Sequence, residues 1–382
     1  MATTSYGSSN QRVDYWHIFQ MLQEYKPTFL SLCKTALPET NPLTGSNIAT
    51  KRMHEWYTYA TQRVASTVAS GATAGGTTFT ITSATGFSEG DVINFLDGNS
   101  ESFVVTDITG SVFTLHDTIG TTHADGTIVI RLGTPQQEGV TPTALSISQA
   151  TKLYNYTQIF ERTVEITGSA NAEVQPLKET SDGLLQYGEK QKLTECYADM
   201  ARTALGGVRI APSGSAIGSR GSMGGLLWWL KQASAIKTDI SAAALTSTLL
   251  DNTLEDVYQK GGAPDTILCS IAKSRTITAF NATNEFKITM QDSSVVGYQR
   301  NQVQPGITGA KPLTIFIDPN MSDYEVALVD SSKLYFLPFS DRALHGKDLP
   351  QTSDSIKRMI LGEYTFHIDD PYNSHALIYN TA

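Results

Sequence analysis

The stretch LLQYGEKQKLTECYADMARTALGG, residues 184–207, carries the longest helical pattern of the chain. Apolar side chains recur there at spacings of three and four residues, which places them on one helix face. They are Leu185, Leu193, Cys196, Tyr197, Met200 and Ala204. Gly206 and Gly207 then supply a helix stop signal. We therefore expect one long helix over residues 177–206, with one face buried.

Downstream of this helix, short strand and helix patterns alternate, which indicates an α+β fold. Met223-Gly224-Gly225 precedes a Leu-Leu-Trp-Trp-Leu run, so we expect a close backbone approach at the glycines and burial of Trp228 in the core. The expected helices cover residues 245–260 and 273–280. The expected strands cover residues 266–270, 313–317, 326–329, 333–337, 362–368 and 375–379.

Upstream of the helix, residues 70–134 differ in composition from the rest of the chain. There are 14 threonines in residues 71–134 and no lysine between Arg52 and Lys152. From Arg63 to Thr151, eight acidic residues outnumber two arginines, a net charge of −6. Short apolar runs separated by glycine-containing turns predict a small antiparallel barrel or sandwich inserted into another fold. These runs cover residues 79–81, 92–95, 103–105, 112–115 and 128–130.

The N-terminal residues 1–62 form a polar, aromatic segment with short helical patterns. Trp16, Phe19 and Gln23 share one helix face, and Pro27 ends that helix. No signal peptide is apparent, and the longest apolar run, residues 226–230, is too short to span a bilayer. We expect a soluble protein that is made in the cytoplasm and has no membrane partner.

Composition and charge exclude several classes of protein. The 382 residues suffice for two or three domains, and a charged share of 17% argues against a highly charged disordered chain. The net charge is −9 and the sequence has no stretch of clustered lysine and arginine, which argues against a protein that binds DNA mainly through phosphate contacts. Cys33, Cys196 and Cys269 are far apart and lack metal-ligand spacing, so we expect three buried thiols.

Motifs that resemble catalytic or binding sequences each lack an essential part. His54-Glu55-Trp56-Tyr57-Thr58 has threonine where a zinc motif needs its second histidine, and is interpreted as a polar helix face. The loop Gly214–Gly221 lacks the lysine end of a phosphate loop, and Gly221–Gly225 only superficially resembles a nucleophile elbow. Asp369-Asp370, read as a strand, would point to opposite faces. We expect no catalytic, cofactor-binding or metal-binding residues, and no enzyme.

The sequence leaves one ion-binding alternative for the acidic segment 70–134. Calcium could bind through Asp97, Asp117 or Asp125, although a DxDxDG loop is absent.

Several segments resemble the major capsid proteins of tailed bacteriophages with the Hong Kong 97-type fold, in the branch whose E-loop carries an inserted β domain. The resemblance covers most of residues 150–382, weakly residues 1–62, and residues 70–134 only in kind. One departure is ALHGKD at 343–348, where the family tends to carry an Ala-Lys-Thr-Gly-Asp run. The matching stretches are NYTQIFERTVEITG (155–168), the long helix, MGGL (223–226), RNQ (300–302), GEYTF (362–366) and HA (375–376).

The resemblance implies a Hong Kong 97-like α+β capsid fold with a long spine helix, peripheral and axial domains, an extended β hairpin and an inserted small all-β barrel. It also implies a division of the chain. Residues 1–62 would be an N-terminal arm lying across a neighbouring subunit, and residues 63–179 the E-loop hairpin with the β domain at about 70–134. Residues 180–236 with 346–382 would be the peripheral domain, and residues 237–345 the axial domain.

The implied function is structural. Copies of the chain would assemble as hexamers and pentamers into the icosahedral head shell, in the bacterial host cytoplasm, and remain in the virion capsid. The implied partners are the chain itself, portal, scaffold or decoration proteins, and packaged double-stranded DNA bound without sequence specificity. Some capsids of this fold join a hairpin lysine to a neighbour's asparagine, but the absence of lysine between Arg52 and Lys152 predicts no such cross-link.

Two alternative classes remain open. An encapsulin-like cargo shell would share the fold without carrying phage DNA. A β-rich hydrolase or glycan-binding protein would need a convergent set of catalytic or binding residues, which the sequence does not supply.

Overall fold

The computed structural model describes twelve segments of the chain: residues 28–35, 49–58, 64–99, 101–135, 151–172, 183–212, 220–280, 287–291, 300–307, 310–340, 342–350 and 353–381. The chain divides into two compact units, one of Met1–Thr58 with Thr151–Ala382 and the other of Tyr59–Ala150. The helix expected from Trp16, Phe19 and Gln23 lies outside the described residues.

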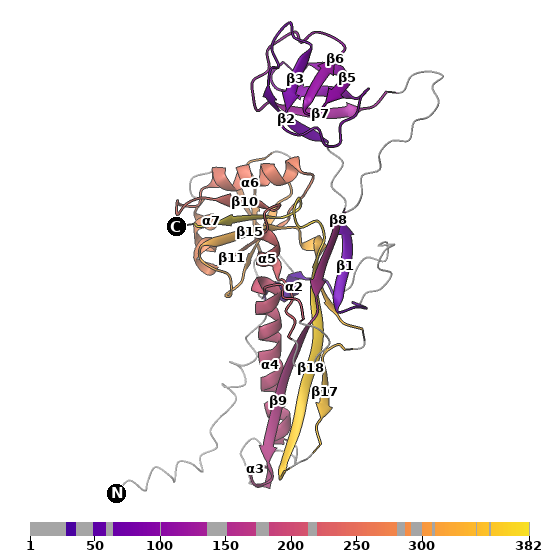
Figure 1. The fold of residues 1–382 in the computed structure, drawn as a ribbon. Coiled ribbons are helices and arrows are strands. Elements are labelled where there is room, and N and C mark those ends of the chain that lie inside the picture. Colours follow the sequence, from indigo (N-terminus) through magenta and orange to yellow (C-terminus); the bar gives the residue numbers. More distant parts are fainter. Residues whose placement is uncertain are drawn as a thin grey trace. The chain divides into compact units, whose positions relative to one another are not determined.

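The unit Tyr59–Ala150 contains a closed β-barrel (Figure 1) with the strand order β2-β3-β6-β5-β4-β7. Five of its strands match the short apolar runs of the sequence, and β2 was missed because Ala65–Ser70 consists mainly of small side chains. The barrel therefore begins before residue 70, the expected boundary. Its strands are β2 (Ala65–Ser70), β3 (Thr78–Ile81), β4 (Val92–Leu96), β5 (Ser102–Thr109), β6 (Val112–Leu115) and β7 (Ile128–Gly133).

The barrel has its own core, which is rich in phenylalanine. The ring of Phe79 lies 5.1 Å from that of Phe95 and 5.6 Å from that of Phe113, measured between centroids. Gly90 and Gly110 adopt φ values of +86° and +64° in the turns between strands, a backbone region that favours glycine. A separate core and glycine turns explain how this short segment closes into a barrel.

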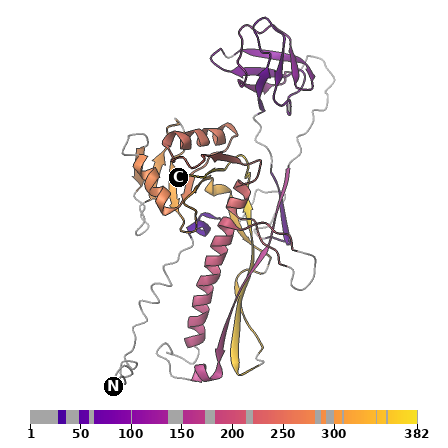
Figure 2. The ribbon, with the colours of Figure 1, turned by 60° about the vertical axis from the view of Figure 1, so that its left-hand side comes forward.

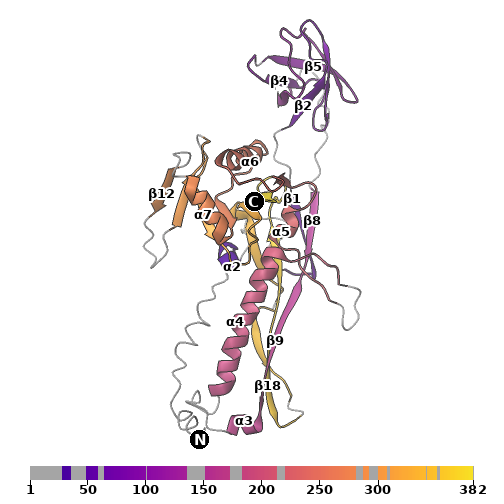
Figure 3. The ribbon, with the colours of Figure 1, turned by 90° about the vertical axis from the view of Figure 1, so that its left-hand side faces the viewer.

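In the larger unit, the long helix α4 (Gly183–Gly206) lies along two long strands, β9 (Gln158–Thr167) and β18 (Ser355–Ile368), as Figure 3 shows. The strand β18 pairs with β9 over Ser355–Tyr364 and also with two shorter strands, β16 (Leu334–Pro338) and β17 (His345–Asp348). It begins seven residues before the expected Gly362, because the polar start Lys357-Arg358 hides its strand pattern. The short helix α3 (Gly168–Ala172) follows β9.

A second sheet in this unit is flanked by helices α6 (Ser247–Gln259) and α7 (Ile271–Ala279), which Figure 2 shows apart from the long helix. Leu250 and Leu254 of α6 and Ile277 of α7 share a buried cluster with the strands. Within the described residues the strand order is β10-β19-β15-β11-β14-β13-β12. The bounds are β10 (Ile236–Asp239), β11 (Thr266–Cys269), β12 (Lys287–Gln291), β13 (Arg300–Gln304), β14 (Leu313–Ile317), β15 (Glu325–Val329) and β19 (Ala376–Tyr379).

The two sheets do not follow the expected split at residues 237 and 346. The C-terminal strand β19, expected in the peripheral domain, pairs with β10 and β15. The strand β16, expected in the axial domain, pairs with β18. The sequence pattern identifies these strands but not their partners, because pairing partners lie far apart along the chain.

The chain enters and leaves the barrel unit through two antiparallel strands, β1 (Met53–Thr58) and β8 (Thr151–Tyr156). The hairpin thus begins ten residues before the expected residue 63, and His54–Thr58 is a strand rather than a polar helix face. His54 and Trp56 are buried while Glu55 between them is only half-buried, which is the period of two of a β-strand. The helix α2 (Thr28–Leu32) belongs to the larger unit. Nearby, Lys34 bridges to Tyr335 and Ala49 bridges to Phe339 within the same unit.

The core of the larger unit contains the short helix α5 (Leu226–Leu230), which follows the glycine pair as expected. A Cβ on Gly225 would lie 2.6 Å from the Thr203 carbonyl oxygen, so α5 can approach the end of α4 only through glycine. The buried tryptophan is Trp229, which is 1% exposed, whereas Trp228 is half-buried. The expectation for Trp228 was therefore wrong by one position. Within the described residues, no helix is both long and apolar enough to cross a membrane.

We predict that Trp229→Ala lowers the free energy of unfolding by about 3–5 kcal/mol, because it leaves a large cavity in a packed core. The matched change Trp228→Ala removes a half-buried ring that covers Arg209 and should cost about 1 kcal/mol. Denaturant unfolding of both variants checks the order, and a larger loss for Trp228→Ala would contradict this assignment.

Candidate functional site

A buried asparagine joins three distant segments where the β1–β8 pair enters the larger unit. The Asn155 Nδ2 donates to the carbonyl oxygens of Gly224, at 2.9 Å, and Phe366, at 2.7 Å. Its Oδ1 accepts from the backbone N–H groups of Gly224, at 2.8 Å, and Tyr156, at 3.0 Å. Both amide hydrogens and both acceptor positions are used, so this fully buried side chain is completely satisfied.

An arginine covers the same junction from the other side. The Arg209 guanidinium lies 4.1 Å from the ring centroid of Tyr154 and 4.3 Å from that of Trp228. It also donates to the Tyr154 carbonyl oxygen at 2.8 Å. A cation between two aromatic faces is attracted by both rings, so Arg209 holds β8 against α5.

Two buried histidines connect β1 to β18. The Nε2 of His54 lies 2.9 Å from Nδ1 of His367, and Nε2 of His367 lies 2.8 Å from Oδ1 of Asp369. The Trp56 ring lies 4.4 Å from the His367 ring. Burial, reinforced by the neighbouring His367, lowers the pKa of His54 to about 3. The His54 ring is therefore an uncharged structural contact near neutral pH.

A third buried histidine lies beside this pair. His375 accepts the backbone N–H of Asp330 at its Nδ1, at 3.2 Å, and its Nε2 lies 3.3 Å from the Asp369 carbonyl oxygen. Burial lowers the pKa of His375 to about 4. Acidification must therefore protonate groups that the fold keeps neutral.

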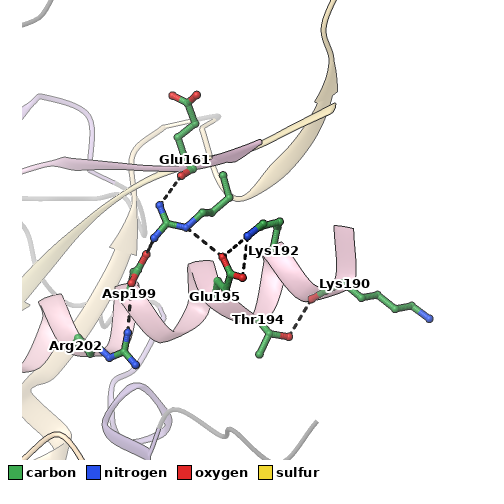
Figure 4. Close-up of polar contacts among 8 residues, drawn as sticks. Glu161, Lys190, Lys192, Thr194, Glu195, Asp199 and Arg202 are labelled. Atoms are coloured by element: carbon green, nitrogen blue, oxygen red, sulfur yellow. Dashed lines mark hydrogen bonds and ion pairs between the residues drawn. The ribbon is translucent and has the colours of Figure 1, made fainter. Parts of the chain in front are cut away.

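A groove of ≈ 620 Å³ lies between β9 and α4, with Phe160 and Cys196 among its lining residues. Figure 4 shows the charges beside it. Arg162 on β9 forms an ion pair with Asp199 on α4 and lies 3.8 Å from Glu195, measured between Nε and Oε2. Arg202 and Lys192 extend this network along the helix. Partly exposed ion pairs contribute at most about 1 kcal/mol each, so the network orients α4 on β9 more than it stabilises the fold.

Two further catalytic-like motifs of the sequence lie in the described residues, where their side chains make structural contacts. Asp369 and Asp370 lie in the turn after β18 rather than on a strand, where Asp369 contacts His367 and Asp370 accepts from Ser374 at 2.8 Å. In the sequence Gly221–Gly225, the Ser222 hydroxyl contacts Gln158 rather than a histidine. Most of the loop Gly214–Gly221 lies outside the described residues.

The structure also places the three cysteines and two of the acidic residues considered for calcium. The three cysteines are buried as expected, and burial raises the pKa of the Cys269 thiol to about 12. Asp97 pairs with His123, and Asp117 pairs with His116 at 3.0 Å. The described part of the chain contains no group of three or more His, Cys, Asp or Glu side chains placed to hold a metal ion.

Sequence reasoning missed the residues that form the junction. Asn155 begins the stretch 155–168 that carries the resemblance, but no pattern indicates its hydrogen bonds, and Arg209 belongs to no motif. Each residue contacts backbone groups or rings that lie far away in the sequence. The one available signal was a polar Asn155 among the apolar and aromatic residues Leu153, Tyr154 and Tyr156. A polar residue within such a run suggests a buried hydrogen-bonding role, although its partners cannot be read from the sequence.

We predict a stability that depends on pH through these histidines. His54 has a folded pKa of about 3, below its unfolded value of about 6.5, so the unfolded chain binds more protons between these values. Its contribution is complete above about pH 6.5 and is lost as the pH falls toward 3. Denaturant unfolding from pH 7 to pH 4 should show a steady loss of stability.

The variant His54→Gln should be less stable at pH 7 and should also lose part of the pH dependence. One such group accounts for a slope of about 1.4 kcal/mol per pH unit. His345→Gln is the control because its ring is exposed, and it should keep the wild-type slope. Equal slopes in all three proteins would show that His54 does not titrate in this way.

Comparison with known proteins supplies the family. The family model for the SU10 major capsid protein matches residues 2–382. No curated protein matches the sequence of this chain.

Several solved structures are distantly similar. A chain of Mycobacterium phage Bobi shares 13% identity at a TM-score of 0.45, with 93% of this chain and 90% of that chain covered. The encapsulin SrpI from Synechococcus elongatus shares 10% identity at a TM-score of 0.44, with 62% of this chain and 77% of that chain covered. The procapsid of satellite phage P4 shares 10% identity at a TM-score of 0.42, with 65% and 79% covered.

The assignment rests on the family model, which spans nearly the whole chain. It confirms the phage major capsid protein expected from the sequence, and the structure confirms the mixed helix-and-strand class. This chain belongs to the SU10 major capsid protein family and is a structural protein of the phage head shell.

Proposed function

We propose that copies of this chain assemble as hexamers and pentamers into an icosahedral shell of the Hong Kong 97 type, which encloses double-stranded DNA. The match to the SU10 major capsid protein over residues 2–382 carries this proposal. The long helix on a pair of long strands supports it, because this arrangement gives a stiff body that can tile a surface.

The proposed division of labour follows the elements of the structure. The helix α4 with β9 and β18 serves as the spine of the peripheral domain, and the sheet flanked by α6 and α7 serves as the axial domain. The pair β1–β8 leads into the E-loop, which carries the barrel. Residues 1–27 serve as the arm on a neighbouring subunit, since Phe29 is already buried in its own chain.

The charge of the chain suits a container for DNA. A net charge of −9 repels phosphate, so packaged DNA is held without being fixed to the wall. The barrel contributes strongly to this charge, with seven acidic residues and one arginine in its described segment. We place it on the outer surface of the shell, in the role that separate decoration proteins play elsewhere. Portal and scaffold proteins are further proposed partners.

Electron microscopy of the purified protein should show closed shells or capsomers. Deletion of residues 1–27 should leave folded subunits that fail to close, because it removes the proposed arm and keeps Phe29, whose N–H donates to Asp318 at 3.0 Å. Circular dichroism checks that these subunits are folded. Normal shells from the deletion variant would refute the role of the arm, and monodisperse wild-type monomers would refute the assembly itself.

We also predict that assembled shells contain no lysine–asparagine cross-links. Lys152 lies on β8, and its Nζ lies 2.7 Å from Oε1 of Glu55. The hydrogen bond to Glu55 raises the pKa of Lys152, which disfavours the neutral amine that a nucleophile requires. Boiled shells should run as a single monomer band on a denaturing gel. A ladder of larger species that Lys152→Arg abolishes would contradict the prediction.

A further inference from the structure

One outer face of the barrel is apolar and carries no charge. It consists of outward-pointing side chains of β4 and β7 with one neighbour on β5, hereafter the β4–β7 face. Three of its residues are strongly exposed, with Leu132 at 58%, Leu96 at 42% and Val104 at 37%. The face comprises Val92, Leu96, Val104, Ile128, Ile130 and Leu132.

The strand register makes five of these residues neighbours on one surface. Leu132, the sixth, lies at the register shift where Val92 pairs with Gly133 and Ile93 with Arg131, and it is assigned to the face by its exposure. Val92 pairs with Val104 across β4 and β5, and Leu96 pairs with Ile128 across β4 and β7. Directly paired residues of antiparallel strands point to the same side of the sheet. The alternate pair Phe95–Val129 is fully buried in the barrel core, which fixes the intervening positions as outward.

The face itself contains no charged side chain. Of the barrel's seven acidic residues, Asp91 is buried and the others lie in turns or on β5 beyond Val104. The Arg131 guanidinium lies 3.8 Å from Asp91 and donates to the Gly86 carbonyl oxygen at 2.9 Å. Asn94 and Ser102, which pair with each other across β4 and β5 between these residues, are polar but uncharged and hydrogen-bond to each other at 2.8 Å, and Asn94 is buried. An uncharged apolar surface thus sits on a barrel whose net charge is negative.

We propose that the β4–β7 face binds the same face of a barrel from a second copy of this chain, and so connects subunits in the shell. Two barrels that each carry a net negative charge repel each other, and on this apolar, uncharged face copies can meet without bringing carboxylates together. Contact between identical faces is self-complementary under twofold symmetry, the commonest arrangement of identical subunits.

The face is small, so a single contact through it is expected to be weak, and many such contacts would act together in a shell. Six side chains are fewer than a stable standalone dimer interface supplies, since such interfaces use about 20–30 residues a side. In a shell the barrels are held at high local concentration, so a weak contact repeated many times is sufficient. DNA is a poor alternative occupant, because the face has no cation to neutralise phosphate. This inference rests on the proposed shell.

Two matched valines test the proposal in the full-length protein. Val104 lies on the face at 37% exposure, and Val112 lies on β6 outside it at 40%. Val104→Asp would place like charges opposite each other at every contact, whereas Val112→Asp adds the same charge elsewhere. Since like charges in an interface are strongly unfavourable, we expect Val104→Asp to lower the yield of closed shells about tenfold, with little change for Val112→Asp.

Leu132→Asp provides a second variant whose exposed position leaves the barrel core intact, and it should behave as Val104→Asp does. Thermal melting of each subunit separates lost contact from lost folding. A density map of wild-type shells should show the β4–β7 faces of two copies in contact. Wild-type yields from both face variants, or a map in which the face meets solvent or another protein, would overturn the inference. Failure of the wild type to form shells would instead overturn the proposed function, and this inference with it.

Discussion

The larger unit depends on the fully satisfied side chain of Asn155. A buried amide with an unpaired group costs free energy, so the chain keeps Asn155 inside only while Gly224 and Phe366 hold their positions. The dependence is mutual, because the N–H and the carbonyl oxygen of Gly224 both hydrogen-bond to the Asn155 side chain. One residue of β8 thereby sets the positions of the α5 turn and of β18.

The remaining parts of the junction follow from this constraint. With the Gly224 turn fixed, Gly225 lets α5 approach the end of α4, and Trp229 fills the space beside Trp56, with ring centroids 5.5 Å apart. Trp56 lies on β1, so the core of the unit and the strand leading to the barrel share a side chain. His54 and His367 extend the contact along β1 and β18. A load on the hairpin is therefore transmitted into the core through buried groups rather than through surface ion pairs.

Local patterns predicted many of the elements, and non-local contacts explain the errors in strand pairing and in the buried tryptophan. The helix stop at Gly206, the strand Leu313–Ile317 and most barrel strands follow from periodicity and glycine placement, which act within a few residues. The strands β16 and β19 were expected in the axial and peripheral domains, yet each pairs with a strand that was expected in the other domain, because pairing joins segments that are distant in sequence. Trp228 and Trp229 are adjacent and chemically identical, so only the packing of α5 decides which is buried. The hydrogen bonds of Asn155 were invisible for the same reason.

The distribution of charge gives the two units different surface chemistry. Lysine is absent from Met53 to Thr151, and the one arginine of the described barrel is paired with the buried Asp91. The larger unit instead carries its basic residues in mixed networks, such as Arg162 with Asp199 and Arg358 with Glu189, which leave little net charge on α4 and its strands. Mixed charge allows copies of the larger unit to pack closely, because each can meet opposite charge on its neighbour. An acidic barrel cannot pack in that way, so any close contact it makes with its own kind has to be through uncharged surface.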